Sequence, residues 1–172
     1  MPGLQRIILI NCHLSGFVEL DVSGHSNICG TNASGKTTLQ RLIPVFYGEL
    51  PSKVVPKTRK KFDDFYLPHA NSYLIYEYQR EDGQSCQVVL TRKGSDGVQY
   101  RFVEAPYDQQ QILVDAEQGN VQAMLPEQWI KQLRQLGISF SHKIQATSEF
   151  RSVIQNDVNV GRGVGRESTK LR

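Results

Sequence analysis

The sequence predicts a mixed α/β (α+β) protein whose sheet includes an antiparallel meander, and three observations support this fold class. A glycine-rich stretch ending in lysine and threonine lies at residues 30–37, and an amphipathic segment follows it. Three runs with strand periodicity come later, at residues 73–79, 86–92 and 98–103. The separators of these runs contain Asp-Gly dipeptides, which favour tight hairpin turns.

Two strands are expected near the amino terminus. Residues 4–11 are rich in isoleucine and leucine, and residues 17–22 alternate between apolar and acidic side chains. A turn near Ser15-Gly16 would join them. A third, short strand at residues 25–29 then leads directly into the glycine-rich stretch, so the expected sheet is mixed.

The glycine-rich stretch runs Gly30-Thr31-Asn32-Ala33-Ser34-Gly35-Lys36-Thr37 and fits the Walker A pattern. Glycines at both ends allow backbone angles at which successive N–H groups turn inward on a polyphosphate. Lys36 would reach the β and γ phosphates, and the Thr37 hydroxyl would bind Mg²⁺. A helix that starts at Thr37 would point the positive end of its dipole at the anion.

This helix is expected to pack on a sheet through one apolar stripe. Pro44 should kink or shorten its last turn, and Gly48 should end it. The stripe has helical spacing and consists of Leu39, Leu42, Ile43 and Phe46.

The segment 49–72 contains three prolines and is expected to be an irregular connection. It also carries the densest basic cluster of the chain, with no acid inside it. Two interpretations remain open: a solvated loop, or a contact with nucleic acid or phosphate. The cluster consists of Lys53, Lys57, Arg59, Lys60 and Lys61.

Aromatic residues concentrate in the three strand-like runs, where cross-strand core packing is favoured over a base-stacking surface. They are Tyr73, Tyr76, Tyr78, Tyr100 and Phe102. Beyond them, residues 104–124 are ambiguous, and a helix is expected from Pro126 to Gly137 with Trp129, Ile130, Leu133 and Leu136 on one face. Residues 138–145 would return as a strand, and Thr147 or Ser148 would cap a last helix through Ile154.

Composition restricts the function classes. The chain has 172 residues and a net charge of +3, too mild to establish a nucleic-acid partner. Its three cysteines form no Cys-x-x-Cys pair and its four histidines show no ligand spacing, so we expect reduced thiols and no transition-metal site. No apolar run is long enough to span a bilayer and no signal-peptide pattern is present, which predicts a cytoplasmic protein with no membrane partner.

A complete P-loop enzyme also needs a carboxylate that orients Mg²⁺ or the attacking water, after an apolar strand. Asp115 follows an apolar run of only three residues, and Glu77 lies within the meander, where we expect it to face solvent. Leu14-Ser15-Gly16 resembles the start of an ABC signature motif, but a strand follows it where a helix is required. The sequence therefore predicts half of a catalytic site.

The order of these features resembles the amino-terminal head lobe of the SMC/RecN/RecF class of ABC-type P-loop ATPases. Those proteins typically show glycine-x-asparagine-glycine-serine-glycine-lysine-serine/threonine-threonine at this point. Asn32, Ser34, Gly35, Lys36, Thr37 and Thr38 match this pattern, and Ala33 replaces a glycine. Leu9-Ile10-Asn11 also resembles the family's opening strand, with Cys12 in place of an aromatic residue.

The resemblance implies a domain plan and a set of site residues. Residues 1–155 would form the amino-terminal lobe of the head, with an antiparallel subdomain at about 73–103. Residues 156–172 would be a flexible basic tail or the start of a connection to a coiled coil. The nucleotide-binding residues would be Gly30, Thr31, Asn32, Ala33, Ser34, Gly35, Lys36, Thr37 and Thr38. Lys36 and a Q-loop glutamine would act in catalysis, with Thr37 and that glutamine near Mg²⁺; Gln145 is the preferred Q-loop candidate and Gln155 its rival.

The implied function is ATP binding with Mg²⁺, and ATP hydrolysis once the carboxy-terminal half of the head and a second head complete the site. The whole protein would act on DNA, in maintenance, repair or defence, in the cytoplasm or at the nucleoid. Lys57, Arg59, Lys60 and Lys61 are the candidate nucleic-acid contacts. Two alternatives remain: a complete small P-loop kinase or NTPase that uses Asp115 or another acid for magnesium, and a nucleotide-gated binding module without hydrolysis.

Overall fold

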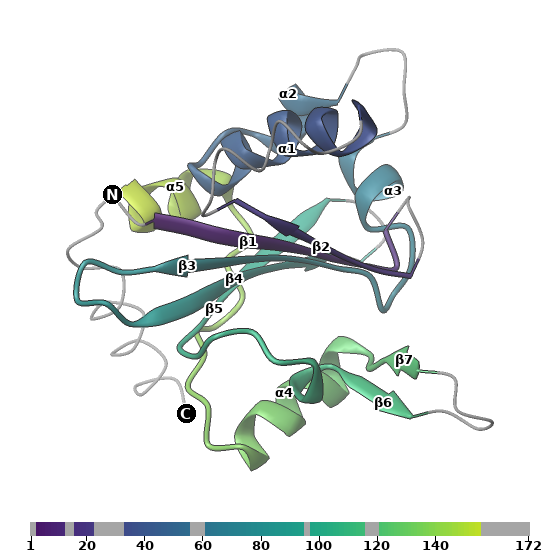
Figure 1. Ribbon diagram of the computed structural model, residues 1–172, viewed down its shortest axis with the longest axis vertical. Coiled ribbons are helices and arrows are strands. Elements are labelled where there is room, and N and C mark those ends of the chain that lie inside the picture. The colour runs from purple at the N-terminus through teal and green to yellow at the C-terminus, as the bar shows by residue number, and fades with distance from the viewer. Residues whose placement is uncertain are drawn as a thin grey trace.

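The computed structural model describes residues 3–12, 16–22, 33–55, 61–94, 97–115 and 121–155, with the backbone alone for 33–37 and 115. It consists of a central sheet covered on both faces (Figure 1). Because a second layer lies on each side, the sheet strands are buried along most of their length.

Within the described residues, the central sheet has five strands in the order β2-β1-β3-β4-β5, and every neighbouring pair is antiparallel. The strands are β1 (Gly3–Ile10), β2 (Phe17–Asp21), β3 (Tyr73–Gln79), β4 (Ser85–Arg92) and β5 (Val98–Val103). The two amino-terminal strands and the meander are therefore confirmed. The expected strand at 25–29 lies outside the described residues, and the described sheet is antiparallel rather than mixed.

The meander continues the amino-terminal hairpin, since β1 pairs with β2 on one side and with β3 on the other. Along β5 runs the segment 138–145, for which the sequence predicts a strand. Only two isolated bridges form there, Tyr100 with Ile144 and Val103 with Phe140. Between them the Ser141 hydroxyl, at 2.9 Å, accepts the bond from the Phe102 N–H, so a side chain replaces a backbone acceptor of a regular ladder.

Four helices cover one face of the sheet (Figure 1). They are α1 (Ala33–Phe46), α2 (Pro51–Val54), α3 (Phe62–Tyr66) and α5 (Thr147–Gln155). The apolar cluster beneath them includes Leu42 and Phe46 of α1 and Phe150 of α5. The predicted α5 is confirmed, whereas the segment 49–72 is less irregular than expected because it contains α2 and α3.

The opposite face carries the 3-10 helix η2 (Gln109–Gln111), the hairpin of β6 (Leu113–Asp115) with β7 (Val121–Ala123), and α4 (Pro126–Gln135) (Figure 1). Trp129 and Leu133 of α4 are buried as predicted. Leu136 is 48% exposed, because the helix ends at Gln135 and Leu136 is already its C-cap residue. None of the described helices is long and apolar enough to cross a membrane.

Coverage of both faces decides two expectations about the meander. Its aromatic side chains are all buried, which confirms core packing and excludes a base-stacking surface: Tyr73, Tyr76, Tyr78, Tyr100 and Phe102. The expectation that Glu77 faces solvent is wrong. Glu77 is 6% exposed, because it points to the face that α4 and η2 cover.

Candidate functional site

The phosphate-loop motif lies where the chain enters α1. Gly30, Thr31 and Asn32 fall outside the described residues, and α1 begins at Ala33 rather than at the expected Thr37. Alanine and serine are well tolerated in a first helical turn, which accounts for the earlier start. The backbone N–H groups of Ala33, Ser34, Gly35 and Lys36 are therefore the first four of the helix, and these have no intrahelical acceptor.

The helix α1 is held on the sheet by its predicted apolar stripe. Leu39, Leu42 and Phe46 are buried, and Ile43 packs partly buried against the same cluster. The Tyr76 hydroxyl donates to the Leu42 carbonyl oxygen at 2.7 Å. The apolar contacts and this hydrogen bond together hold α1 in place on the sheet.

The direction of α1 follows from its contacts with β3. Leu42 contacts Tyr76, the Phe46 ring contacts both Tyr76 and Tyr78, and Figure 1 shows α1 running in the same direction as β3. The first turn of α1 therefore points to the end of the sheet at which β1 ends and β3 begins. Thr38, the last residue of the motif, is buried beneath this turn at 5% exposure.

The carboxyl end of α1 closes as predicted. Pro44 lies inside the helix, which ends two residues later at Phe46. The N–H groups of Tyr47 and Glu49 both donate to the Pro44 carbonyl, at 3.1 and 3.0 Å. Gly48 ends the helix with a φ of 100°. Residues that carry a Cβ rarely adopt this backbone conformation.

Gln145 lies at the same end of the sheet as the first turn of α1. Ile144 is bridged to Tyr100, and strand register places Tyr100 level with Leu90 and Leu74. From Phe140 to Ile144 the chain advances toward the start of β5, and Gln145 is exposed one step further on. Two strands, β4 and β5, separate this position laterally from β3, over which α1 lies.

The rival Gln155 lies at the other end of α1. Its Nε2 donates to the Tyr47 carbonyl at 3.3 Å, just beyond the last helical residue. Since α1 has 14 residues, this end is about 20 Å from the first turn. Of the two glutamines, only Gln145 lies at the end of the sheet where α1 begins.

The two acids considered as magnesium ligands are not brought to α1. Asp115 ends β6, which lies on the opposite face of the sheet. The Glu77 carboxylate is bound by Arg6 on that same face, and its Oε2 also accepts from the Tyr107 N–H at 2.8 Å.

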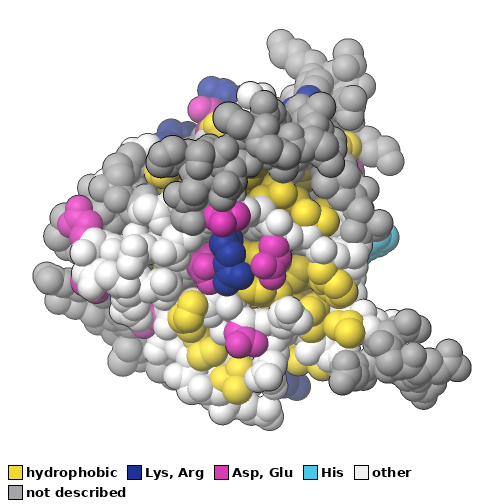
Figure 2. Space-filling model, viewed as in Figure 1, with side chains coloured by type: hydrophobic (Ala, Val, Ile, Leu, Met, Phe, Trp, Pro, Cys, Tyr) yellow, Lys and Arg dark blue, Asp and Glu magenta, His cyan; other side chains and the backbone are white. Residues whose placement is uncertain are grey.

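Most of the predicted basic cluster lies outside the described residues, namely Lys57, Arg59 and Lys60. Lys53 is exposed on α2 and pairs with Glu49 at 3.8 Å, and Lys61 precedes α3 and is exposed. On the face shown in Figure 2, acidic side chains flank the basic group at its centre, so the described residues form no basic patch there.

Thiols and histidines form no metal centre in the described segments: no three of the His, Cys, Asp and Glu side chains there come together as potential ligands. Cys12 and Cys86 are buried and free, as expected of reduced thiols, and Cys29 lies outside the described residues. Burial raises the pKa of the Cys12 thiol to about 12 and that of Cys86 to about 11, so neither is a nucleophile at neutral pH.

The structure also brings together residues that the sequence did not single out. Arg101 of β5 and Arg134 of α4 meet at the ring of Phe140 beside a pocket. They are 33 positions apart in the chain, and no local motif links them.

In a comparison with protein families, residues 8–172 match the family described as "Protein of unknown function (DUF3584)". No curated protein matches the chain. Because the match includes both layers around the sheet and the phosphate-loop motif, the chain belongs to the DUF3584 family.

Proposed function

We propose that this chain is the ATP-holding amino-terminal lobe of an SMC-like ATPase head. The observation that carries the proposal is the position of Gly35 and Lys36 in the first turn of a helix seated on a buried sheet, with Thr37 directly after them. There the unpaired N–H groups and the helix dipole favour a bound polyphosphate. The lysine side chain and the threonine hydroxyl would add charge neutralisation and a ligand for Mg²⁺.

The proposed lobe holds only half of the hydrolytic site. Asp115 and Glu77 belong to the opposite face of the sheet, whereas Gln145 lies at the end of the sheet where α1 begins. Gln145 would contact Mg²⁺ and the hydrolytic water. A Walker B carboxylate and a signature motif would come from a carboxy-terminal lobe and from a second head that engages when ATP is bound.

The described sheet also weighs against a complete small kinase. Such an enzyme requires parallel strands that alternate with helices after the phosphate loop. Here β3, β4 and β5 follow α1, α2 and α3 as a continuous antiparallel meander.

Nucleotide binding tests the first half of the proposal. Titration of the chain with Mg-ATP in a calorimeter should give saturable binding, which Lys36→Ala weakens at least about tenfold by removing the charge at the phosphates. The matched control is Lys53→Ala, since Lys53 is an exposed lysine of α2 whose one described ion pair is with Glu49. Equal binding by the Lys36 and Lys53 variants would refute a phosphate site at α1.

Turnover tests the second half. The chain alone should hydrolyse ATP at the background rate, and addition of a carboxy-terminal lobe should produce turnover that Lys36→Ala abolishes. Robust Lys36-dependent hydrolysis by the 172 residues alone would refute the half-site.

DNA is the proposed partner of the whole protein, with residues 57–61 as a contact. Joint neutralisation of Lys57, Arg59, Lys60 and Lys61 should weaken DNA binding and reduce the slope of log affinity against log salt by up to about 4. An unchanged slope would make this segment a solvated loop.

A further inference from the structure

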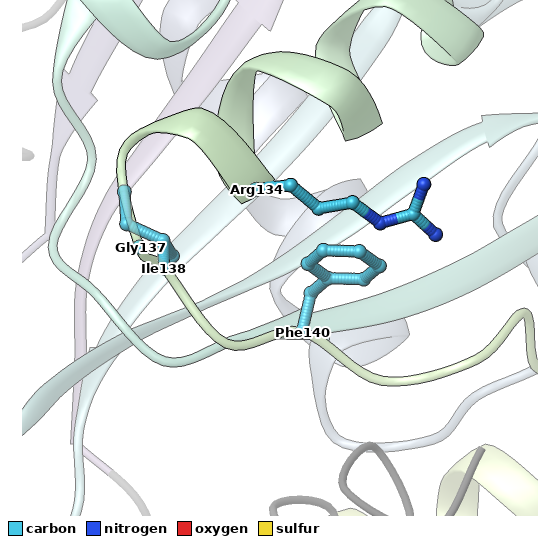
Figure 3. A pocket seen from close by; sticks show the side chains of 4 residues that line it. All are labelled: Arg134, Gly137, Ile138 and Phe140. Carbon is cyan, nitrogen blue, oxygen red and sulfur yellow. The ribbon is translucent and has the colours of Figure 1, made fainter. Parts of the chain in front are cut away.

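The pocket beneath the carboxyl end of α4 has a volume of about 390 Å³ and is lined by Arg134, Gly137, Ile138 and Phe140 (Figure 3). This volume lies within the range of small-molecule sites, roughly 300–1,000 Å³. It is on the face of the sheet opposite α1, so it is separate from the proposed nucleotide site.

Two guanidinium groups converge on the Phe140 ring at this pocket. The Arg134 Cζ lies 5.6 Å and the Arg101 Cζ 5.7 Å from the ring centroid. Figure 3 shows the Arg134 guanidinium extended along the ring. Contact with a ring uses the flat face of a guanidinium, and its N–H donors lie along the edges of the group, where they remain available to an anion.

The positive charge at this pocket is not neutralised by any described acid. Neither Arg101 nor Arg134 forms an ion pair with a described carboxylate, and the one side-chain hydrogen bond of Arg101 to a described residue goes from Nη1 to the Ser141 carbonyl at 2.8 Å. Burial lowers the pKa of Arg101, and the nearby charge of Arg134 lowers it further. A bound anion would relieve this repulsion between two cations.

The carboxyl end of α4 is closed by backbone bonds: the carbonyl of Gln132 accepts from Leu136, that of Arg134 from Gly137, and that of Leu133 from Ile138. None of the described carbonyl oxygens accepts a hydrogen bond from the Arg134 guanidinium. Gly137 adopts a φ of 71° and has no side chain to fill the space beside it. The remaining walls are the apolar surfaces of Ile138 and Phe140.

We propose that the pocket lined by Arg134, Ile138 and Phe140 binds a small oxyanion carried on an apolar body, with Arg101 adding positive charge beside the Phe140 ring. Phosphate and carboxylate groups share the geometry that a guanidinium edge recognises. The apolar walls would contact the aromatic or aliphatic part of the ligand, as in other small-molecule sites.

Phenyl phosphate and benzoate are suitable probes, and their relative affinities show which oxyanion the site prefers. Titrations at constant ionic strength, followed by the side-chain Nε–H resonances of arginine, should show saturable binding with a Kd of about 1 mM or lower. Arg134→Gln should weaken binding at least about tenfold, because it removes the exposed guanidinium. Lys131→Gln is the matched control: it removes the same charge from an exposed position of α4 that does not line the pocket.

Two further variants of the titration distinguish this site from the nucleotide site and from binding of the aromatic ring alone. Lys36→Ala should leave the affinity unchanged, whereas binding lost in that variant would place the probes at the nucleotide site and overturn the proposal. Phenol, which has the ring without the oxyanion, should not bind. The proposal is also overturned if phenol binds equally well, if Arg134→Gln and Lys131→Gln have equal effects, or if neither anionic probe saturates.

Discussion

The Arg6 guanidinium binds the Glu77 carboxylate through two parallel hydrogen bonds, Nε to Oε1 at 2.8 Å and Nη2 to Oε2 at 2.7 Å. The pair links neighbouring strands β1 and β3, and the same carboxylate accepts from the Tyr107 N–H. It therefore ties the sheet to the segment that leads into η2. The charge-assisted bonds also raise the pKa of Arg6, so its guanidinium stays protonated at every accessible pH.

Glu77→Ala should lower the free energy of unfolding by about 2–3 kcal/mol, because a buried N–H and a half-buried guanidinium lose their acceptor together. Denaturant unfolding measures this loss. Glu19→Ala is the control: Glu19 also contacts Arg6, at 3.3 Å, but its side chain is 45% exposed. That change should cost under about 1 kcal/mol. Equal losses in the two variants would contradict the assignment of a buried structural pair.

Gly48 and Arg151 join the carboxyl end of α1 to α5. The Arg151 Nε donates to the Gly48 carbonyl at 2.8 Å, and a Cβ added at Gly48 would lie 2.6 Å from the Arg151 Cγ. Gly48→Ala should therefore cost about 2–3 kcal/mol, from backbone strain together with this collision. Gly83→Ala isolates the strain, since Gly83 has a φ of 88° and open space around its Cβ position.

A double-mutant cycle then tests the collision itself. Arg151→Ala removes the Cγ atom that the new methyl group would strike, so it should reduce the cost of Gly48→Ala toward that of Gly83→Ala. Additive effects of the two substitutions would show that the Arg151 side chain beyond Cβ does not contribute to the cost, since the Arg151 Cβ and Cα, at 3.0 and 3.3 Å from the added methyl group, remain in the variant.

The buried thiols predict a loss of stability in alkali. Burial raises the pKa of Cys12 from an ordinary value of about 9 to about 12, and that of Cys86 to about 11. The folded state holds these protons while the unfolded state releases them above pH 9, so the stabilisation is complete below pH 9 and is lost as pH rises toward the folded pKa. At pH 10.5 the loss for Cys12 is about 2 kcal/mol, and that for Cys86 is smaller.

Denaturant unfolding at about pH 8 and about pH 10.5 measures this effect. Cys12→Ser is the informative variant, because a hydroxyl stays protonated in both states at these pH values. Its stability should fall less between the two pH values than that of the unaltered chain. An identical fall would show that Cys12 ionises equally in the folded and unfolded states.

Local patterns predict most elements of this fold. The alternation in β2 and the Asp-Gly turns of the meander act over a few residues, and the stripe of Leu39, Leu42 and Phe46 is a property of one helix. The short helices α2 and α3 are not predicted, because helices of four and five residues are stabilised by packing rather than by intrinsic propensity. The burial of Glu77 is not predicted either, because the sequence of a strand does not show that α4 and η2 will cover its second face.

The same distinction applies to the candidate sites. The phosphate-loop residues follow one another in the chain, so their spacing alone predicts their chemistry. The positions of Gln145 and Gln155 relative to α1 depend on the bridge of Ile144 to Tyr100 and the bond from Gln155 to Tyr47, which are tertiary contacts. The pair Arg101 and Arg134 depends entirely on how α4 packs beside β5.

Trp129, the only tryptophan of the chain, reports on the docking of α4. It is 1% exposed, and its ring meets Tyr73 edge to face with centroids 5.6 Å apart. The native protein should therefore show blue-shifted tryptophan emission and weak quenching by acrylamide, both of which change on unfolding. Leu136→Ala, at a 48% exposed position just past the helix, should leave the emission unchanged and alter the stability by less than about 0.5 kcal/mol. Leu133→Ala, at a fully buried position of the same helix, should cost about 2–4 kcal/mol. Native emission that matches the unfolded chain would mean that α4 is not packed on the sheet in solution.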